Sequence, residues 1–234
     1  MGLTNYEINF VMKKTPDLAS MCNFWSGVGT TAYLNKTNNS LTFPKNVPAI
    51  ELGPGFNPLL IGEPTEYIGV EPIHKNETEK ILKTKNLEPH FKKLRSENKL
   101  RVIQTDAYSF LKNLPNNSAF VYSFGLFDVC NQLGGNCETQ EEINIKEKYV
   151  QALTDEIARV TPDKTVSIHK GICHADYFTK AGFVPLPVSN DTTFSIHFLK
   201  HKMNHGDSIE NPLNKNQRIE CKKLSSGINF WIFK

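Results

Sequence analysis

Residues 47–58 read VPAIELGPGFNP, an apolar run that ends in an acid and a pair of glycines between prolines. Such a run before glycine and proline is typical of a buried strand that ends in a tight turn. Gly53 and Gly55 have no Cβ, so the backbone can turn sharply and a ligand can approach it closely. The amides of a following helix start can bind an anionic group. The stretch therefore predicts a ligand-binding turn after the first strand.

The rest of the chain alternates between strand and helix patterns. We expect strands near residues 47–52, 67–71, 101–104, 119–124 and 165–170. Apolar residues at spacings of three and four predict helices over residues 76–95, 107–114 and 141–160. This alternation predicts a parallel sheet with helices on both faces. Residues 192–202 and 228–234 are also strand-like, with a polar loop between them, and predict an antiparallel pair that closes the sheet.

Composition describes an ordinary folded chain that can form one α/β domain or two small ones. Its 234 residues are 39% hydrophobic and 22% charged, with a formal net charge of +3. Basic residues are interleaved with acids, and the densest basic stretch, residues 90–99, is typical of a solvated helix face. The pattern gives no indication of a nucleic-acid partner. No stretch approaches the ~18 apolar residues of a membrane span, so no membrane partner is expected.

The cysteines indicate a reducing compartment. They are five in number, far apart and without a CxxC pair: Cys22, Cys130, Cys137, Cys173 and Cys221. An odd number without a secretory signal argues against a disulfide framework. The N-terminal residues lack the apolar core and cleavage site of a signal peptide. We therefore expect a cytoplasmic protein.

Three ligands suit the turn after the first strand. A phosphate-binding P-loop needs GxxxxGK[ST], and no such string follows Gly53. A dinucleotide-binding turn needs GxGxxG, with a small residue at the last position for close packing of helix and strand. Gly53 and Gly55 satisfy its start, but Pro58 occupies the sixth position. The NAD interpretation is thereby weakened and stays open beside the third, an amino-acid-bearing nucleoside.

The stretch PAIELGPGFN, residues 48–57, resembles the first motif of the class I S-adenosylmethionine-dependent methyltransferases. That motif is an apolar strand followed by an acid, any residue, Gly, any residue and Gly, and Glu51, Gly53 and Gly55 are in register with it. Asn57 stands where the family often has a third glycine. The resemblance covers roughly residues 45–234. It implies a Rossmann-like three-layer α/β sandwich around a mostly parallel seven-stranded sheet, with S-adenosyl-L-methionine as cofactor.

Further motifs follow in the family's order. YIGVEP, residues 67–72, resembles the second strand with an acid at its tip, and VIQTDAYSFL, residues 102–111, the third strand and its loop. FVYSFGLFD, residues 120–128, resembles the fourth strand, and residues 175–187 the helix after the fifth. The acid after the second strand can accept from ribose hydroxyls. The resemblance implies nine cofactor-binding residues: Glu51, Gly53, Pro54, Gly55, Glu71, Pro72, Asp106, Ala107 and Ser123.

Methyl transfer from a sulfonium requires little of the protein beyond orienting the acceptor against the methyl group. The leaving group needs no proton, and a general base is needed only if the acceptor is protonated at rest. The sequence accordingly marks no catalytic residue. By position, the acceptor-side candidates lie after the fourth and fifth strands and in the N-terminal segment: Phe124, Asp128, His174, Trp25 and Tyr33. We expect residues 1–44 to form a helical lid segment and residues 45–234 the cofactor-binding domain.

Two histidine groups have the composition of metal sites, and neither predicts one. His169, Cys173 and His174 cluster after the fifth strand without a fourth ligand, and His169 or His174 is instead a candidate base or acceptor contact. The second group has helical spacing but lies in a strand pattern, where residues i and i+4 are about 13 Å apart. Its members are His197, His201 and His205.

The leading hypothesis is methyl transfer from S-adenosylmethionine to a small molecule or a protein side chain. The alternatives are an NAD-dependent oxidoreductase, aminopropyl transfer from a related cofactor, and a methyltransferase-like fold that only binds. Aminopropyl transfer usually requires an acid-rich pocket, and the segment directly after Ser123 offers only Asp128. The sequence carries no motif for the acceptor or the oligomeric state.

Overall fold

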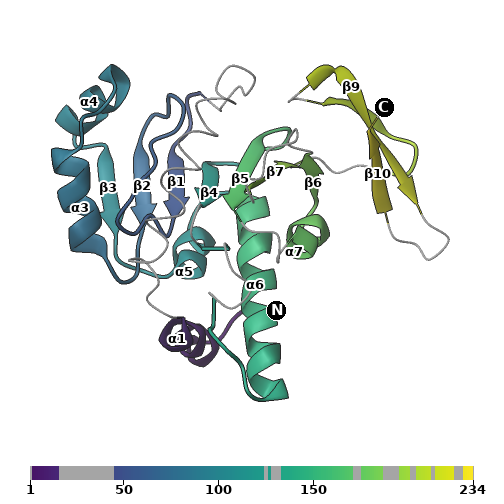
Figure 1. Ribbon diagram of the computed structural model, residues 1–234, viewed down its shortest axis with the longest axis horizontal. Helices are drawn as coiled ribbons and strands as arrows, with labels where there is room; N and C mark the ends of the chain where they lie inside the picture. The colour runs from purple at the N-terminus through teal and green to yellow at the C-terminus, as the bar shows by residue number, and fades with distance from the viewer. Residues whose placement is uncertain are drawn as a thin grey trace.

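The computed structural model describes residues 2–15, 45–123, 126–127, 133–170, 175–186, 195–200, 204–211, 214–223 and 229–233. At its centre is a sheet of order β3-β2-β1-β4-β5-β7-β6 (Figure 1). Its strands are β1 (Ala49–Leu52), β2 (Tyr67–Val70), β3 (Leu100–Ile103), β4 (Phe120–Ser123), β5 (Val166–Lys170), β6 (Phe183–Leu186) and β7 (Ser195–Lys200). Strands β1 to β5 run parallel, whereas β7 is antiparallel to both β5 and β6. The mostly parallel α/β sheet is confirmed.

The two faces of the sheet are covered differently. Helices α1 (Asn5–Lys14), α5 (Ala107–Lys112), α6 (Gln140–Val160) and α7 (Ala175–Lys180) share one apolar cluster with alternate residues of the central strands. The other cluster joins the opposite strand residues to Leu82 of α3 (Lys75–Thr84), to Leu59 and Ile61, and to a second sheet. Strands β1, β2 and β4 are buried at every position, which explains why most of their residues are apolar.

One predicted helix is two. The pattern over residues 76–95 forms α3 and α4 (Pro89–Ser96), with a break at residues 85–88. Pro89 is the first residue of α4, where its missing amide hydrogen costs nothing. Glu88, directly before it, has the extended backbone that a residue before proline prefers, so the first helix cannot continue through it.

An antiparallel strand pair is present in the central sheet, but it is β6 and β7 and not the predicted pair of residues 192–202 and 228–234. Strand β7, which falls within residues 192–202, pairs with β5 and β6. Residues 229–233 form β10 (Asn229–Phe233), which pairs with β9 (Asn214–Lys223) in a separate sheet of order β10-β9-β8. Much of the expected polar loop is thus β8 (Ser208–Asn211) and β9. This second sheet lies beside the β6 end of the central sheet in Figure 1.

The second sheet escaped prediction because its strands carry many charges. Along β9, Ile219 and Cys221 are buried, whereas Arg218 is exposed and Glu220 and Lys222 are half-buried. This alternation is that of a strand with one buried face, and Ile219 and Cys221 join the second apolar cluster of the central sheet. Two buried positions among lysines, arginine and glutamate are too few to mark a strand by hydrophobicity alone.

Helix α1 packs along the N-terminal half of α6. Thr4 and Glu7 form a capping box at its start. Glu7 pairs with Lys148 at 2.6 Å, and Lys14 pairs with Glu142 at 2.7 Å. Since α6 begins after β4 and runs back along the sheet, its N-terminal half lies on the side where the parallel strands end. Figure 1 shows α1 beside it there.

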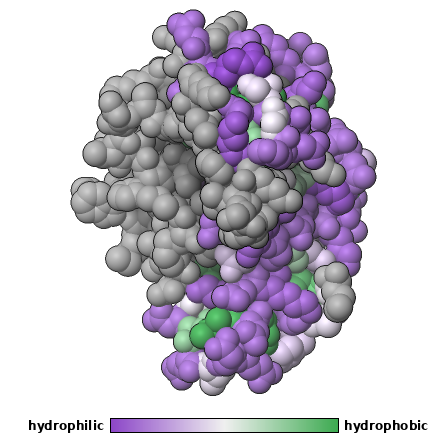
Figure 2. All heavy atoms as spheres, turned by 90° about the vertical axis from the view of Figure 1, so that its right-hand side faces the viewer, coloured by the Kyte–Doolittle hydropathy of each residue, from purple (hydrophilic) through white to green (hydrophobic). Residues whose placement is uncertain are grey.

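On the face drawn in Figure 2, hydrophilic residues cover most of the described surface. Among the described residues, the exposed large hydrophobic side chains are Tyr6 and Ile73. Over the same part of the chain, no helix combines the length and the apolar character needed to cross a membrane.

Candidate functional site at the carboxyl edge of the sheet

The glycine turn follows β1 at the point where the strand order reverses. Strand β1 pairs with β2 on one side and β4 on the other, and such a switch point is where open α/β sheets bind ligands. Gly53 and Gly55 have φ values of 67° and 51°, in the left-handed region that favours glycine. The predicted turn is therefore present at the carboxyl edge of the sheet.

No helix follows this turn. Residues 53–66 run from β1 to β2 without a helical segment, and the next helix is α3, after β2. The predicted helix start with its anion-binding amides is therefore wrong at this position. Buried side chains hold the connection in place of helical hydrogen bonds, and both motif acids are among them.

Glu71, directly after β2, holds the turn at Gly55. Its Oε2 accepts from the amide of Gly55 at 2.8 Å. Its Oε1 accepts from the amides of Ile73 and His74 at 3.0 and 3.1 Å, just before α3 begins. The side chain is only 4% exposed. From α3, the Thr78 hydroxyl lies 2.6 Å from the Gly55 carbonyl oxygen and donates to it. Gly55 is thus held at both its amide and its carbonyl.

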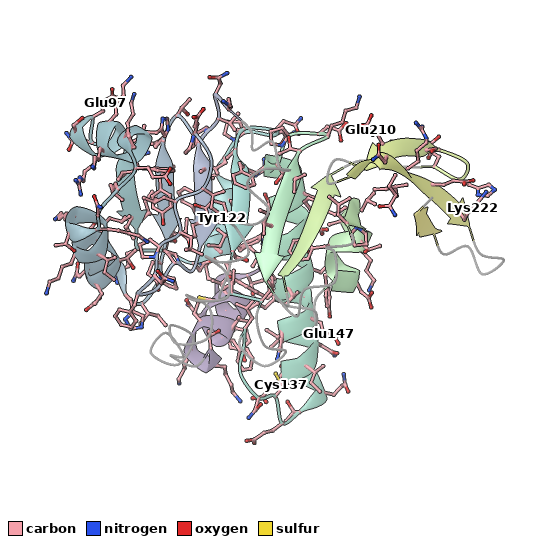
Figure 3. The ribbon with its side chains drawn as sticks, turned by 45° about the horizontal axis from the view of Figure 1, so that its top comes forward. Glu97, Tyr122, Cys137, Glu147, Glu210 and Lys222 are labelled. Carbon is pink, nitrogen blue, oxygen red and sulfur yellow. The ribbon has the colours of Figure 1, made fainter. Side chains whose placement is uncertain are left out.

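Glu51, within β1, holds the same connection further along. Its Oε2 accepts from the Tyr67 hydroxyl at 2.6 Å and from the Leu59 amide at 2.9 Å. Burial raises the pKa of Glu51 to about 8, although the bonds from Tyr67 and Leu59 oppose the shift. The Tyr122 hydroxyl donates to the Leu59 carbonyl at 2.5 Å, and Figure 3 shows Tyr122 within the central sheet. The backbone of Leu59 is therefore held on both sides.

Asp106 lies after β3, at the N-cap of α5. Its Oδ1 accepts from the Ser109 amide at 2.9 Å, and the Tyr149 hydroxyl lies 3.5 Å from the same atom. Both contacts use Oδ1, so Oδ2 can accept from a ligand. Ala107, the first residue of α5, is buried. Because β1, β2 and β3 are neighbours, Glu51, Glu71 and Asp106 come from adjacent strand ends at one edge.

An apolar rim lies beside Glu71, and of its residues only Pro72 was predicted from the sequence. Ile73 is 47% exposed, and the rings of Phe56 and His74 lie 4.5 Å apart between centroids. Pro72, which stands between Glu71 and Ile73 in the chain, is half-buried. An exposed isoleucine two residues after a strand-end acid offers flat apolar contact next to a hydrogen-bond acceptor. The signal that could have identified it is an apolar residue in the loop YIGVEPIH, outside any periodic pattern.

Ser123 and His169 meet under the same edge. Ser123 ends β4, and its Oγ lies 2.8 Å from Nδ1 of His169 on β5. Both side chains are fully buried, and burial lowers the pKa of His169 to about 3. A buried imidazole with this pKa neither reaches an acceptor nor serves as a base near neutral pH. The structure therefore contradicts the expectation of a base or acceptor contact at His169.

The remaining acceptor-side candidates lie outside the described residues: Trp25, Tyr33, Phe124, Asp128 and His174. Cys173 and His201 lie outside them as well. Within the described ranges, no group of three or more His, Cys, Asp or Glu residues is placed to hold a metal ion. His197 lies on β7, a strand as predicted.

The tyrosines that support the turn were not predicted either. Tyr67 and Tyr122 stand in strands where valine or isoleucine would give the same apolar pattern. A buried tyrosine hydroxyl usually has a hydrogen-bond partner. Tyrosine at such positions therefore signals a polar contact, but the partner follows only from the sheet order, which brings β2 and β4 to either side of β1.

Comparison with known proteins found structural likeness at low sequence identity and no match that assigns a function to this chain. No family model and no curated protein matches the chain. It is similar to the [4+2]-cyclase SpnF, at 10% identity and TM-score 0.40 over 67% of this chain and 57% of that one. It is similar to a TehB-like SAM-dependent methyltransferase from Corynebacterium glutamicum, at 12% identity and TM-score 0.43 over 83% of this chain and 98% of that one. It is also similar to the pyocyanin biosynthetic protein PhzM, at 10% identity and TM-score 0.48 over 82% of this chain and 60% of that one.

The chain thus spans less than two thirds of the length of SpnF and of PhzM. Likeness at these identities and TM-scores carries no argument about activity. The functional conclusion therefore rests on the geometry of the carboxyl edge.

Proposed function

We propose that the chain is a methyltransferase that uses S-adenosyl-L-methionine and acts on a small molecule or a protein side chain. The observation that carries this proposal is a glycine turn at the switch point with no helix behind it. The pyrophosphate of NAD binds at the N-terminus of a helix that follows such a turn. S-adenosylmethionine has no phosphate and does not require one. Residues 53–66 therefore favour the sulfonium nucleoside over the dinucleotide.

The polar groups at the edge suit a nucleoside that bears an amino acid. Asp106 Oδ2 can accept from the adenine amino group, and Ile73 offers apolar contact for the ring. Glu71 stands where ribose hydroxyls would be bound and can accept from them in addition to its amide donors. Gly53 and Gly55 let the methionine part approach the backbone. The residues proposed to form the cofactor site, by direct contact or by positioning, remain the nine expected from the sequence: Glu51, Gly53, Pro54, Gly55, Glu71, Pro72, Asp106, Ala107 and Ser123.

The contacts of Glu51 and Ser123 suggest that both act indirectly. Glu51 binds Tyr67 and Leu59, and the Ser123 hydroxyl faces His169. In our proposal they position the turn and the end of β4, respectively. When bound, the cofactor supplies an activated methyl group on a sulfonium that leaves without a proton. The protein's task is then to orient the acceptor against that methyl group, an effect worth up to ~7–11 kcal/mol.

The acceptor side and the setting of the protein are further parts of the proposal. We propose that residues 1–44, together with the segment after β4, form the acceptor side over a domain of residues 45–234. Helix α1, at the edge where the strands end, supports this placement. Among the described cysteines, Cys137 is a free thiol. Free thiols agree with a reducing, cytoplasmic setting.

Titration of the purified protein separates the hypotheses. Calorimetry should show saturable binding of S-adenosylhomocysteine, whereas NADH fluorescence should not change on addition of protein. Binding of NADH alone would support the oxidoreductase. No binding of S-adenosylhomocysteine at millimolar concentration would contradict the proposal. Transfer of a labelled methyl group to any component of fractionated lysate would then distinguish an enzyme from a binding module.

A further inference from the structure

A buried chain of hydrogen bonds joins β4 to β5 just under the carboxyl edge. Ser123 and His169 face each other across the two strands, and Ser123 Oγ lies 2.8 Å from His169 Nδ1. On the other side of the ring, His169 Nε2 lies 2.8 Å from Oγ of Ser167. Ser167 Oγ in turn lies 2.5 Å from the carbonyl oxygen of Val121 on β4. All three side chains are fully buried.

The direction of these hydrogen bonds follows from counting hydrogens. Two oxygens 2.5 Å apart require a hydrogen between them, so Ser167 donates its single hydrogen to the Val121 carbonyl. Ser167 Oγ can then only accept from His169, which places the imidazole hydrogen on Nε2. Nδ1 is therefore bare and must accept from the hydroxyl of Ser123. The tautomer of His169 is thus determined by a backbone carbonyl of β4.

Two aromatic rings pack against the imidazole and connect it to residues outside the strands. Phe127 meets His169 edge-on at 5.5 Å, and Phe178 of α7 lies over it at 4.6 Å. Phe127 and Phe178 are themselves in edge contact at 5.2 Å. Phe127 belongs to the segment that follows β4. The two serines and the two phenylalanines that contact the His169 ring are uncharged, and such surroundings suit a neutral imidazole.

We propose that His169 is a positioning residue for the acceptor side of the site, through its hydrogen bond to Ser123 and its ring contact with Phe127. The inference rests on the proposed function. The segment after β4 leaves the sheet at Ser123, and Phe127 is its next buried anchor among the described residues. His169 contacts both points, one through a nitrogen and one through its ring. It thereby connects the end of β4 to Phe127.

The first test is spectroscopic and independent of any ligand. Nitrogen-15 shifts of the His169 imidazole should show the Nε2–H tautomer, unchanged between about pH 8 and pH 5, since an exposed histidine titrates near 6.5. An Nδ1–H tautomer, or titration of His169 in this range, would overturn the hydrogen-bond chain.

The second test separates the nitrogen from the ring. His169→Phe keeps a ring between Phe127 and Phe178 but leaves the buried Ser123 hydroxyl without an acceptor. His169→Asn keeps an acceptor at the position of Nδ1. We expect affinity for S-adenosylhomocysteine to fall about tenfold or more in the Phe variant, because the Ser123 hydroxyl then turns to another acceptor and the end of β4 moves with it. The Asn variant should stay within about threefold of wild type by the same reasoning. Each affinity is corrected for the folded fraction.

The other outcomes are decisive as well. Equal affinity in wild type and both variants, or an equal loss in both, would overturn the positioning role of the hydrogen bond. If His169→Phe does not fold, Ser123→Ala removes the same hydrogen bond from the other side and should show the same loss. If wild type itself does not bind S-adenosylhomocysteine, the result contradicts both the proposed function and the positioning role that rests on it. The tautomer measurement still decides the hydrogen-bond chain in that case.

Discussion

The Tyr67 hydroxyl donates to Oε2 of Glu51 at 2.6 Å, and the same oxygen accepts the amide of Leu59 at 2.9 Å. The acid of the glycine motif therefore points to the connection between β1 and β2. That connection has no helix to supply its own hydrogen bonds. Buried side chains from β1, β2, β4 and α3 supply them instead, through Glu51, Glu71, Tyr122 and Thr78. The turn is held in shape before any ligand arrives.

The raised pKa of Glu51 predicts a pH dependence of stability. Its folded pKa of about 8 lies above the ordinary value of 4.5, so the protonated form is favoured by folding. The contribution is fully present below the unfolded pKa and is lost as pH rises through the folded one. For wild type this amounts to about 4 kcal/mol of unfolding free energy between pH 5 and pH 9.

Glu51→Gln should remove this dependence, because its amide oxygen still accepts from Tyr67 and Leu59 but carries no charge. Urea unfolding at several pH values should show the variant becoming progressively more stable than wild type from pH 5 to pH 9. Parallel profiles for the two proteins would mean that Glu51 is not titrating in this range. Glu210→Gln, an exposed change on the second sheet (Figure 3), serves as the control.

Tyr122→Phe should destabilise the protein through a single lost hydroxyl. The change leaves the buried carbonyl of Leu59 without the donor that lies 2.5 Å away. An unsatisfied buried acceptor costs about 1–3 kcal/mol. The matched control is Tyr6→Phe, because Tyr6 is 65% exposed and its change should stay within ~0.5 kcal/mol. Equal unfolding free energies for the two variants would refute the role given to Tyr122.

Much of the fold was predictable from the sequence. Strands β1, β2 and β4 are near-continuous apolar runs because both faces of a parallel sheet are covered, and such runs need no knowledge of the tertiary structure. Helices α5 and α6 were predicted within one or two residues from apolar spacing. The carboxyl-edge placement of Glu51, Glu71 and Asp106 follows once the strands are adjacent and parallel.

The errors have a common cause in long-range contacts. The pairing of β7 with β5 and β6 depends on which strand edge is free after folding, which no local pattern contains. The connection after Gly55 has no helix, and its backbone at Leu59 is bound by Glu51 and Tyr122 from neighbouring strands. Tyr67 in turn donates to the Glu51 carboxyl group. The sequence suggested a reactive His169 because its neighbours along the chain, Cys173 and His174, can take part in chemistry. Its partners are instead Ser123 and Phe127, far away in the chain.

Gly135 lies against the C-terminal end of α1, and this close contact predicts that a larger residue would displace the helix. A Cβ on Gly135 would lie 2.2 Å from the carbonyl oxygen of Lys14, and its φ is 58°. Beside it, the Gly134 amide donates to the Thr15 hydroxyl at 3.0 Å. Gly135→Ala should therefore push the end of α1 away from this loop, with a measurable rise in amide hydrogen exchange in residues 5–15.

Gly206→Ala separates the clash from the backbone strain. Gly206 also has a positive φ, 89°, but a Cβ there meets nothing within 4 Å. Strain alone costs about 1–2 kcal/mol, and Gly135→Ala should exceed the loss in Gly206→Ala. If both variants lose the same stability and α1 exchanges as in wild type, the contact between Lys14 and Gly135 does not hold the helix.

The central claim is that the carboxyl edge binds the adenosyl group of S-adenosylmethionine, and calorimetry of Asp106→Asn with S-adenosylhomocysteine tests it most directly. Asparagine keeps the N-cap of α5, so the fold is preserved, but it can replace the acceptor Oδ2 with a donor. Asp155→Asn on the exposed face of α6 is the matched control. We predict micromolar-range binding in wild type and control, and at least about tenfold weaker binding in Asp106→Asn. Equal binding by all three proteins, or none by wild type, would contradict the account.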